Sequence, residues 1–304
     1  MEPGLIVICG PTATGKSALA LQIASRLKAP IVSADSRQVY QGFDIGTAKP
    51  TIRDRAQVPH YLIDICPPTT HYTVAEYQRA AQTLIQDVQE QGAVPLLVGG
   101  TGLYIQSVVE GLKIPRVAPQ PQLRSQLETI SQSERYQWLR QVDEDSSQKI
   151  HAHDQVRTLR ALEVYYTTGI PLSAQQGRQP PAYPILRIGL DIADLVCHTE
   201  MIQQRTQSML KQGWLAEVSH LLETHGLDLP LLQTLGYSEL NAYLAGVLSL
   251  EESVAQIVLH TRQFAKRQRT WFRSDPTIQW FDAASPQLFA QVWNCVELFL
   301  NRSL

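Results

Sequence analysis

Eight residues near the start of the chain have the types and spacing that can hold a phosphate group. They form the stretch Gly10–Ser17 (GPTATGKS), which fits the pattern G-x-x-x-x-G-K-[ST] and follows the apolar run Leu5–Cys9. Glycines in such a loop let backbone N–H groups point at an anion, and the following helix adds its N-terminal dipole. We expect the lysine to neutralise terminal phosphates and the serine hydroxyl to bind Mg²⁺. The residues predicted to bind phosphate are Gly10, Pro11, Thr12, Ala13, Thr14, Gly15, Lys16 and Ser17.

A second glycine-rich turn stands where nucleotide-hydrolysing enzymes usually carry an acid. In those enzymes an apolar strand ends in an acidic residue that handles Mg²⁺. Here the apolar run Val94–Val98 is followed by Gly99–Gly102 (GGTG). The N–H groups of this turn and the hydroxyl of Thr101 are suited to contact phosphate oxygens. The alternative is a tight strand-to-helix turn that needs glycine only for its backbone geometry.

One acid has a suitable position, Asp35, because it ends the apolar run Ile31–Ala34. Ligands of open parallel sheets bind at the carboxyl ends of the strands. With the common strand order, this strand lies directly beside the strand of the phosphate loop. Asp35 could act as a general base, bind Mg²⁺ through water, or cap a turn together with Ser36.

The segment Thr261–Arg273 holds five cations in thirteen residues. On a helix, four of them fall on one stripe, which suits a phosphate backbone or a diphosphate. Phe264 and Trp271 lie on another face, and we expect them to anchor the helix to the core. The alternative is a solvated helix face. The stripe consists of Arg262, Lys266, Arg269 and Arg273.

The elements that must position these residues alternate between short β-branched runs and helical patterns, which favours a parallel sheet wrapped by helices. A capping box at Thr73 and Glu76 predicts a helix that ends before Gly92. The fold class predicted is α/β, with a P-loop NTPase-like parallel sheet core wrapped by helices and an inserted helical subdomain. The expected strands are Leu5–Cys9, Pro30–Ala34, Tyr61–Ile65, Pro95–Val98 and Leu186–Leu190.

The inserted part is predicted from a change of composition after Gly111. Residues 115–184 are polar, with helical patterns and prolines at both ends, and an apolar run resumes at Ile185. We therefore expect residues 1–114 and 185–304 to form the core and residues 115–184 to form the inserted subdomain. The alternative is a long decorated connection that packs on the core.

Bulk composition limits the remaining possibilities. The formal net charge is −2, so no global basic field indicates a nucleic-acid partner, although a local basic face could still bind one. The four cysteines lie far apart, which favours reduced thiols in a cytoplasmic protein. No secretory signal and no apolar run long enough to span a membrane are found, so we expect no membrane partner. We expect a monomer.

Several motifs spread over nearly the whole chain resemble the bacterial-type tRNA dimethylallyltransferase family. The phosphate loop alone is generic, but "DIGTAKP" and "GGTGLY" at this spacing are specific. The matching stretches are GPTATGKS (Gly10–Ser17), DSRQVY (Asp35–Tyr40), DIGTAKP (Asp44–Pro50), PHYLID (Pro59–Asp64), LVGGTGLY (Leu97–Tyr104), RTLRALEV (Arg157–Val164), LGYSEL (Leu235–Leu240) and KRQRTWFR (Lys266–Arg273).

The resemblance implies a prenyl transfer. Dimethylallyl diphosphate donates its five-carbon group to N6 of the adenosine 3′ of the anticodon in tRNA, and diphosphate leaves. Asp35 would be the general base. Lys16, the loop N–H groups and Mg²⁺ on Ser17 would stabilise the leaving group, and Thr101 would hydrogen-bond the released oxygen. The loop would then hold a departing diphosphate, and an "ATP-binding" description would be right about the loop and wrong about its ligand.

The resemblance also implies an RNA-binding surface that recognises the anticodon stem-loop. The target base must leave the stack and enter the pocket. The inserted subdomain would act as a clamp on the RNA, and Arg205 would bind diphosphate or tRNA phosphates. Residues implied in tRNA binding are Asp35, Ser36, Arg37, Gln38, Thr101, Arg124, Arg157, Arg160, Lys266 and Arg269.

Two positions depart from the family pattern, and other functions remain open. His153 stands where the family usually has Asn, and Met201 replaces a usual Arg, which removes one expected cation. No C-terminal Cys/His zinc finger of the eukaryotic kind is found. The alternatives are a small-molecule kinase, an enzyme that prenylates free AMP or ADP, and an RNA-binding module that uses nucleotide as a switch.

Overall fold

The computed structural model describes residues 3–303, which form two compact units. The larger unit consists of the chain up to Gln106 and from Ala182 onward, and the smaller unit is Ser107–Pro181. The boundaries expected from composition were 115 and 184, so the smaller unit begins earlier than composition indicated. We describe each unit by itself.

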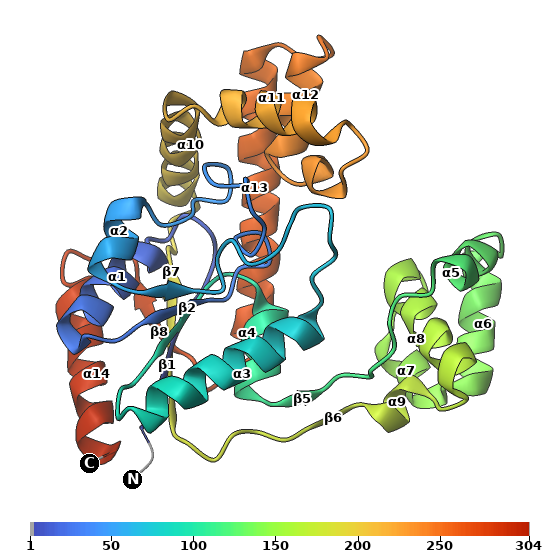
Figure 1. Cartoon of the computed structure of the whole chain (residues 1–304), viewed down its shortest axis with the longest axis horizontal. Helices are drawn as coiled ribbons and strands as arrows, with labels where there is room; N and C mark the ends of the chain where they lie inside the picture. Colours follow the sequence, from blue (N-terminus) through green and yellow to red (C-terminus); the bar gives the residue numbers. More distant parts are fainter. Residues whose placement is uncertain (1–2, 304) are drawn as a thin grey trace. The chain divides into compact units, whose positions relative to one another are not determined.

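The larger unit, in which Figure 1 labels β1, β2, β7 and β8, is built on a six-stranded sheet in the order β3-β2-β4-β1-β7-β8. Every strand pair in this sheet is parallel. The predicted α/β class, with a parallel sheet wrapped by helices, is therefore confirmed. The expectation that β2 lies directly beside β1 is wrong, because β4 pairs with both of them. The strands are β1 (Leu5–Cys9), β2 (Ile31–Ser33), β3 (His60–Tyr61), β4 (Leu96–Val98), β7 (Ile185–Asp191) and β8 (Gln279–Asp282).

Two strands differ from the sequence prediction. The strand expected at residues 61–65 ends at Tyr61, because Leu62 and Asp64 have positive φ angles of 61° and 59° that an extended strand cannot contain. The edge strand β8 was not predicted, and its four residues include only half-buried and exposed side chains. Neither difference affects the strand ends that carry the phosphate loop.

Both faces of the sheet are covered. Successive strand residues point to opposite faces, and they are buried on both sides. Ile6 and Ile8 pack with the α1 and α14 side chains, while Val7 is buried as well. The capping box predicted at Thr73 forms at the start of α3. The helices are α1 (Lys16–Leu27), α2 (Ile52–Gln57), α3 (Val74–Glu90), α4 (Gly102–Val109), α10 (Leu195–Lys211), α11 (Trp214–His225), α12 (Tyr237–Leu244), α13 (Leu250–Arg273) and α14 (Leu288–Ser303), with a short 3₁₀ helix at Pro230–Gln233.

The smaller unit is helical and has a hydrophobic core of its own. Leu139 and Leu162 are fully buried at its centre. Near the two ends of this unit, the chain forms two short strands that pair antiparallel, β5 (Leu112–Lys113) and β6 (Gly177–Arg178). The helices are α5 (Pro121–Glu128), α6 (Gln132–Val142), α7 (Glu144–Lys149), α8 (Gln155–Thr168) and α9 (Leu172–Gln175).

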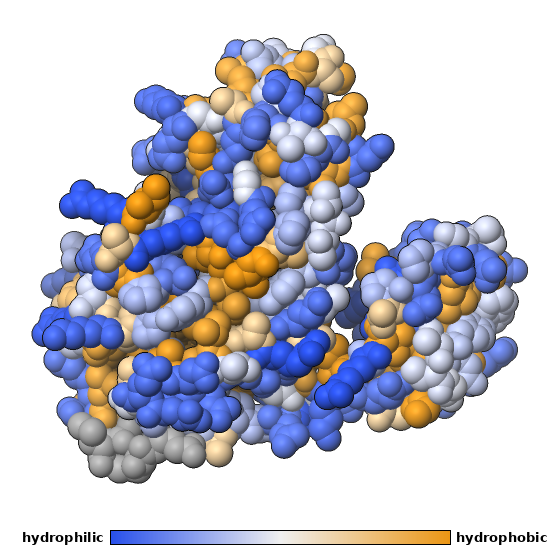
Figure 2. All heavy atoms as spheres, viewed as in Figure 1, coloured by the Kyte–Doolittle hydropathy of each residue, from blue (hydrophilic) through white to orange (hydrophobic). Residues whose placement is uncertain are grey.

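On the face shown in Figure 2, hydrophilic residues are mixed with hydrophobic ones over both units. None of the helices within residues 3–303 combines the length and the apolar character that crossing a membrane requires.

Candidate diphosphate site

The phosphate loop connects the carboxyl end of β1 to the start of α1. Its backbone turns through left-handed conformations at Gly10 (φ 132°), Ala13 (φ 62°) and Gly15 (φ 76°). At Gly10 a Cβ atom would lie 2.2 Å from the carbonyl oxygen of Leu190, so only glycine fits beside β7. The Thr14 hydroxyl closes the loop by donating to the Pro11 carbonyl at 2.9 Å. The loop therefore has the geometry that the glycine pattern predicted.

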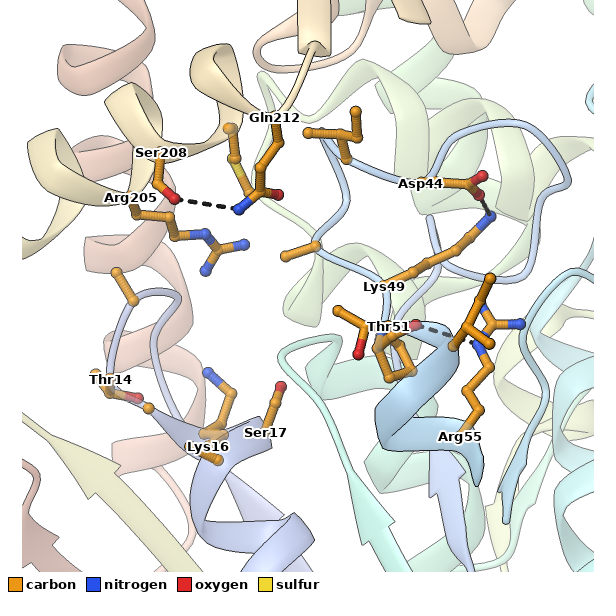
Figure 3. Close-up of a pocket in the computed structure, with 18 of the residues that line it drawn as sticks. Thr14, Lys16, Ser17, Asp44, Lys49, Thr51, Arg55, Arg205, Ser208 and Gln212 are labelled. Carbon is orange, nitrogen blue, oxygen red and sulfur yellow. Dashed lines mark hydrogen bonds and ion pairs between the residues drawn. The ribbon is translucent and has the colours of Figure 1, made fainter. Parts of the chain in front are cut away.

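A pocket of about 760 Å³ opens beside this loop. Figure 3 shows Lys16 and Ser17 at the start of α1 and Arg205 reaching from α10 toward the loop, with Lys49 and Arg55 across the cavity. The pocket wall consists of residues 13–18 of the loop and α1, residues 44–45, 48–52, 55 and 64, and four α10 residues together with Gln212.

The charges on the two sides of the pocket differ. Lys49 pairs with Asp44 at 2.7 Å and with Asp64 at 2.5 Å, and Arg55 pairs with Asp64 at 2.8 Å. On the loop side, Lys16 donates to the Pro11 carbonyl at 2.5 Å and Arg205 donates to the Thr12 hydroxyl at 2.9 Å. Neither of these two cations forms an ion pair with an acid in residues 3–303. The loop side therefore carries two cations without an ion-pair partner in the described residues, an arrangement that suits an anion.

Burial in the protein lowers the pKa values of both cations. Burial and, to a smaller extent, the nearby positive charge of Arg205 together lower the pKa of Lys16 to about 8. Burial also lowers the pKa of Arg205, while attraction to Asp35 opposes that shift. A bound anion would stabilise the charged form of both side chains.

Asp35 lies outside the pocket wall, and its carboxylate caps the turn that follows β2. One oxygen, Oδ1, accepts hydrogen bonds from the N–H groups of Arg37 at 2.8 Å and Gln38 at 3.4 Å. The other, Oδ2, has no hydrogen-bond partner within the described part of the chain. Attraction to Asp35 partly offsets the lowering of the pKa of both Lys16 and Arg205, so the structure brings the three charges within electrostatic range. Asp35 therefore caps this turn through Arg37 and Gln38, while Ser36 binds Thr101, and the cap leaves Oδ2 without a hydrogen bond.

Thr101 and Gln38 make contacts within the protein. The Thr101 hydroxyl accepts from the Ser36 N–H at 3.0 Å and donates to the Ser36 hydroxyl at 3.3 Å. The side-chain amide of Gln38 accepts from the Ser33 hydroxyl at 2.9 Å and donates to the carbonyls of Thr47 and Ala48 at 3.1 Å. These two side chains hold the second glycine turn and the Asp44–Pro50 segment against the end of β2, and Arg37 alone of this turn is exposed.

The Asp44–Pro50 segment forms part of the pocket wall, a role that the sequence did not predict. The carboxylate of Glu217 on α11 accepts from the N–H groups of Asp44, Ile45 and Gly46 at 3.0, 2.7 and 3.2 Å. Gly46 is required there, because a Cβ atom would lie 2.2 Å from the Trp214 side chain. The motif was recognised in the sequence, but its anchor lies on a helix more than 160 residues further along the chain.

The basic stretch forms the last part of α13, and two of its arginines, Arg269 and Arg273, are paired with an acid. Arg269 makes a bidentate pair with Asp191 at 2.7–2.9 Å, and Arg273 donates to the same carboxylate at 3.0 Å. Together with backbone and Arg273 hydrogen bonds, this pairing lowers the pKa of Asp191 against the opposing effect of burial. Lys266 is exposed. The cationic stripe is therefore only partly a free surface.

Phe264 and Trp271, expected to anchor α13 to the core, do not lie on its buried face, although Trp271 packs against Gly102 at the start of α4. Their side chains are 38% and 46% exposed. The buried face instead carries Ala265, Gln268 and Phe272, spaced three and four residues apart. Hydrophobicity indicated the wrong face because a buried glutamine lies at the centre of the correct one.

Two of the three arginines assigned to RNA in the smaller unit are bound to one buried carboxylate. Arg124 and Arg160 each pair with Glu163 at 2.7 Å. Burial alone would raise the pKa of Glu163, but hydrogen bonds from Arg124, from the Gln120 N–H and from Arg160 outweigh it and lower that pKa to about 2. Arg157 is largely exposed and pairs with Asp154 at 2.5 Å, so it is the arginine of this set that faces solvent.

The side chains around the pocket offer few ligands for Mg²⁺. Among residues 3–303 no group of three His, Cys, Asp or Glu side chains could hold a metal ion. Ser17 is exposed at the edge of the pocket and offers one hydroxyl. Mg²⁺ commonly keeps several waters and binds to substrate phosphates, so this donor set fits an ion held mainly by a diphosphate.

Comparison with known proteins places the chain in a family. The family model described as IPP transferase matches residues 38–275. The chain belongs to the IPP transferase family. The tRNA dimethylallyltransferase of Acaryochloris marina is 66% identical over 297 residues, which cover 98% of each chain. The corresponding protein of Cyanothece sp. is 63% identical over 96% of each chain.

Solved structures of IPP transferase relatives have the same architecture. The tRNA isopentenylpyrophosphate transferase of Bacillus halodurans is 32% identical with a TM-score of 0.74, covering 99% of this chain and 98% of that one. A eukaryotic dimethylallyltransferase described as acting on tRNA is 27% identical with a TM-score of 0.80, covering 93% of this chain and 74% of that one. Met201 contributes to the pocket wall of this IPP transferase.

Proposed function

We propose that the protein transfers the dimethylallyl group of dimethylallyl diphosphate to N6 of the adenosine 3′-adjacent to the anticodon in tRNA. The observation that carries this function is the 66% identity, over 98% of both chains, to a protein named tRNA dimethylallyltransferase. The unneutralised cations beside the phosphate loop agree with it, because they suit a diphosphate that accumulates negative charge as it leaves.

The leaving group is the first chemical problem. Breaking the allylic C–O bond leaves positive charge on carbon and a further negative charge on diphosphate. Lys16 and Arg205 would face that developing charge from two sides, and the N–H groups at the start of α1 would donate to the same oxygens. No acid is needed after β4 to orient a hydrolytic water, which agrees with the glycine turn found there.

The nucleophile is the second problem, because an exocyclic adenine amine is weakly nucleophilic and loses a proton as the N–C bond forms. In the proposed reaction, N6 bonds to the terminal allylic carbon, the C–O bond breaks, diphosphate leaves, and one N6 proton passes to Asp35. The Oδ2 atom of Asp35 would accept it, since Oδ1 is occupied by the turn.

Ser17 is the protein residue that would bind Mg²⁺, with the diphosphate supplying the other oxygens. When bound, the ion would neutralise part of the charge of the leaving group. The exposed Ser17 hydroxyl beside Lys16 supports this assignment.

The RNA partner is proposed to be the anticodon stem-loop. Exposed cations on both units would contact its phosphates, and Arg157 in the smaller unit and Lys266 on α13 are exposed candidates. The smaller unit would act as the RNA clamp. We further propose a monomeric, cytoplasmic enzyme.

The decisive experiment is mass spectrometry of tRNA nucleosides after incubation with the protein, dimethylallyl diphosphate and Mg²⁺. The proposal predicts a mass increase of one dimethylallyl group on a single adenosine per tRNA. A parallel reaction with AMP or ADP in place of tRNA should give no prenylated product. ATP consumed with a small-molecule acceptor, with tRNA unchanged, would instead indicate a kinase.

A further inference from the structure

A buried glutamine on α13 joins the two glycine-rich turns of the site. Gln268 is only 7% exposed. Its Oε1 atom accepts from the Thr12 N–H in the phosphate loop at 2.8 Å, and its Nε2 atom donates to the Gly100 carbonyl in the second turn at 2.9 Å. The two turns follow β1 and β4, which are neighbours in the sheet. One side chain therefore spans the phosphate loop and the turn that holds Thr101.

The orientation of this amide is determined by its partners. A backbone N–H can only donate and a backbone carbonyl can only accept, so Oε1 must face Thr12 and Nε2 must face Gly100. The fit is close, because a Cβ atom at Gly100 would lie 2.3 Å from Nε2. A carboxylate of the same size could serve Thr12, but it would have no proton for Gly100.

Thr12 itself is held on three sides by side chains from two helices. Gln268 binds its N–H, His198 Nε2 lies 2.9 Å from its carbonyl oxygen, and Arg205 donates to its hydroxyl at 2.9 Å. Because all three polar groups of Thr12 are in use, its N–H serves to hold the loop, whereas the N–H groups at the start of α1 remain for an anion.

The same residues connect the loop to the buried Asp191 pair. Arg269, next to Gln268 in the chain, approaches His198 Nδ1 at 3.3 Å. An arginine has no acceptor, so Nδ1 must accept and Nε2 must carry the proton that it donates to Thr12. The basic motif of α13 thus supports the phosphate loop through consecutive residues, one directly and one through His198.

We propose that Gln268 is a positioning residue for the diphosphate, holding the phosphate loop and the Gly99–Gly102 turn in the spacing that the leaving group requires. This inference rests on the proposed function, because the diphosphate is its leaving group. Gln268 lies at the centre of the basic motif Lys266–Arg273. Its proposed role is to hold two turns of the protein together, and this role requires no contact with RNA.

The test compares Gln268→Met with Gln263→Met. Gln263 lies on the same helix with an exposed side chain and no hydrogen bond within the described residues, so it controls for the same chemical change. For Gln268→Met we expect the dissociation constant of inorganic diphosphate to rise about tenfold, because an unmade buried hydrogen bond costs about that factor. We expect the KM for dimethylallyl diphosphate to rise with it, while the affinity for an anticodon stem-loop RNA stays within about twofold.

A second variant makes the test independent of whether the methionine variant folds. In Gln268→Glu the introduced carboxyl can satisfy both partners only when it is protonated. The ratio of variant to wild-type dissociation constants for diphosphate should therefore fall as the pH is lowered from about 8 to about 5. A purely structural role would not produce this recovery.

Three outcomes would overturn the inference. They are an unchanged diphosphate affinity in folded Gln268→Met, an equal loss of diphosphate and RNA affinity, and a pH-independent ratio for Gln268→Glu. Each of them leaves the proposed function intact if wild-type protein prenylates tRNA. Failure of the wild-type protein to prenylate tRNA, with diphosphate binding retained, would reject the proposed function and leave the positioning role of Gln268 in place.

Discussion

At the scale of single residues, Asp35 has two oxygens with different tasks. The turn uses Oδ1, and Oδ2 is left to accept a proton. Asp35→Asn keeps an oxygen for the turn and removes the base, so we expect kcat to fall roughly 100- to 10,000-fold with RNA and diphosphate affinity nearly unchanged. Single-turnover prenylation of tRNA and direct binding measure the two quantities. A kcat close to that of the wild type would remove Asp35 from this role.

Lys16 makes the free energy of unfolding depend on pH. Its pKa is about 8 in the folded protein and near 10.5 when unfolded, so between these values the unfolded state binds more protons. The free energy of unfolding should therefore rise with pH between about 8 and 10.5, by at most about 1.4 kcal/mol per pH unit. Urea unfolding of wild type and Lys16→Met across this range measures the effect. Equal slopes in the two proteins would contradict the shifted pKa.

At the scale of elements, α13 carries one cation that is paired with a buried acid, Arg269, and another that is exposed to solvent, Lys266. Arg269→Gln breaks a bidentate pair with a buried carboxylate, and we expect it to lower the free energy of unfolding by about 1–3 kcal/mol. Lys266→Gln changes an exposed side chain, so it should leave stability unchanged and reduce the salt dependence of tRNA binding by about one unit of slope. Calorimetry and RNA titrations at several salt concentrations separate them. A Lys266→Gln protein with the wild-type salt slope would mean that this face is only solvated.

Features that depend on local patterns could be predicted from the sequence, whereas the long-range contacts of α13 could not. The phosphate loop, β1 and the helix cap at Thr73 follow from local patterns, and the structure contains them. The position of β4 between β2 and β1 depends on pairing between distant segments, which periodicity does not encode. Gln268 and Glu217 were missed because each binds backbone groups that lie more than 160 residues away in the chain. A polar residue inside a buried helical stripe was the one local signal for Gln268.

In the smaller unit, α5 and α8 are joined by a charge cluster around Glu163. The folded pKa of Glu163, about 2, lies below its ordinary value, so this stability is complete above about pH 4.5 and is lost as the pH falls toward 2. We expect Glu163→Gln to lower stability by about 2 kcal/mol at neutral pH, because Arg124 and Arg160 lose their shared partner. The difference from wild type should shrink between pH 4.5 and pH 2 in calorimetry. A difference that is constant over this range would contradict the assignment.

At the scale of the whole molecule, the two chain segments that lead into and out of the helices of the smaller unit are paired with each other. Lys113 and Gly177 are paired across an antiparallel ladder, and the Gln179 N–H donates to the Gly111 carbonyl at 2.9 Å. This pairing means that residues 114–176 can be replaced by Asn-Gly, because a two-residue turn of this kind closes an antiparallel pair. The larger unit should then fold without the smaller one, since its core is made by its own strands and helices.

The shortened protein separates the diphosphate site from the RNA clamp. Every residue of the phosphate pocket belongs to the larger unit, so the affinity for inorganic diphosphate should stay within about threefold of the wild type. If the smaller unit binds RNA, the kcat/KM for tRNA should fall at least about 100-fold, because several phosphate contacts are lost together. Diphosphate binding serves as the internal control for folding. Wild-type tRNA prenylation by a protein that retains diphosphate binding would show that the helical unit is not the clamp and that the RNA is held by the larger unit alone.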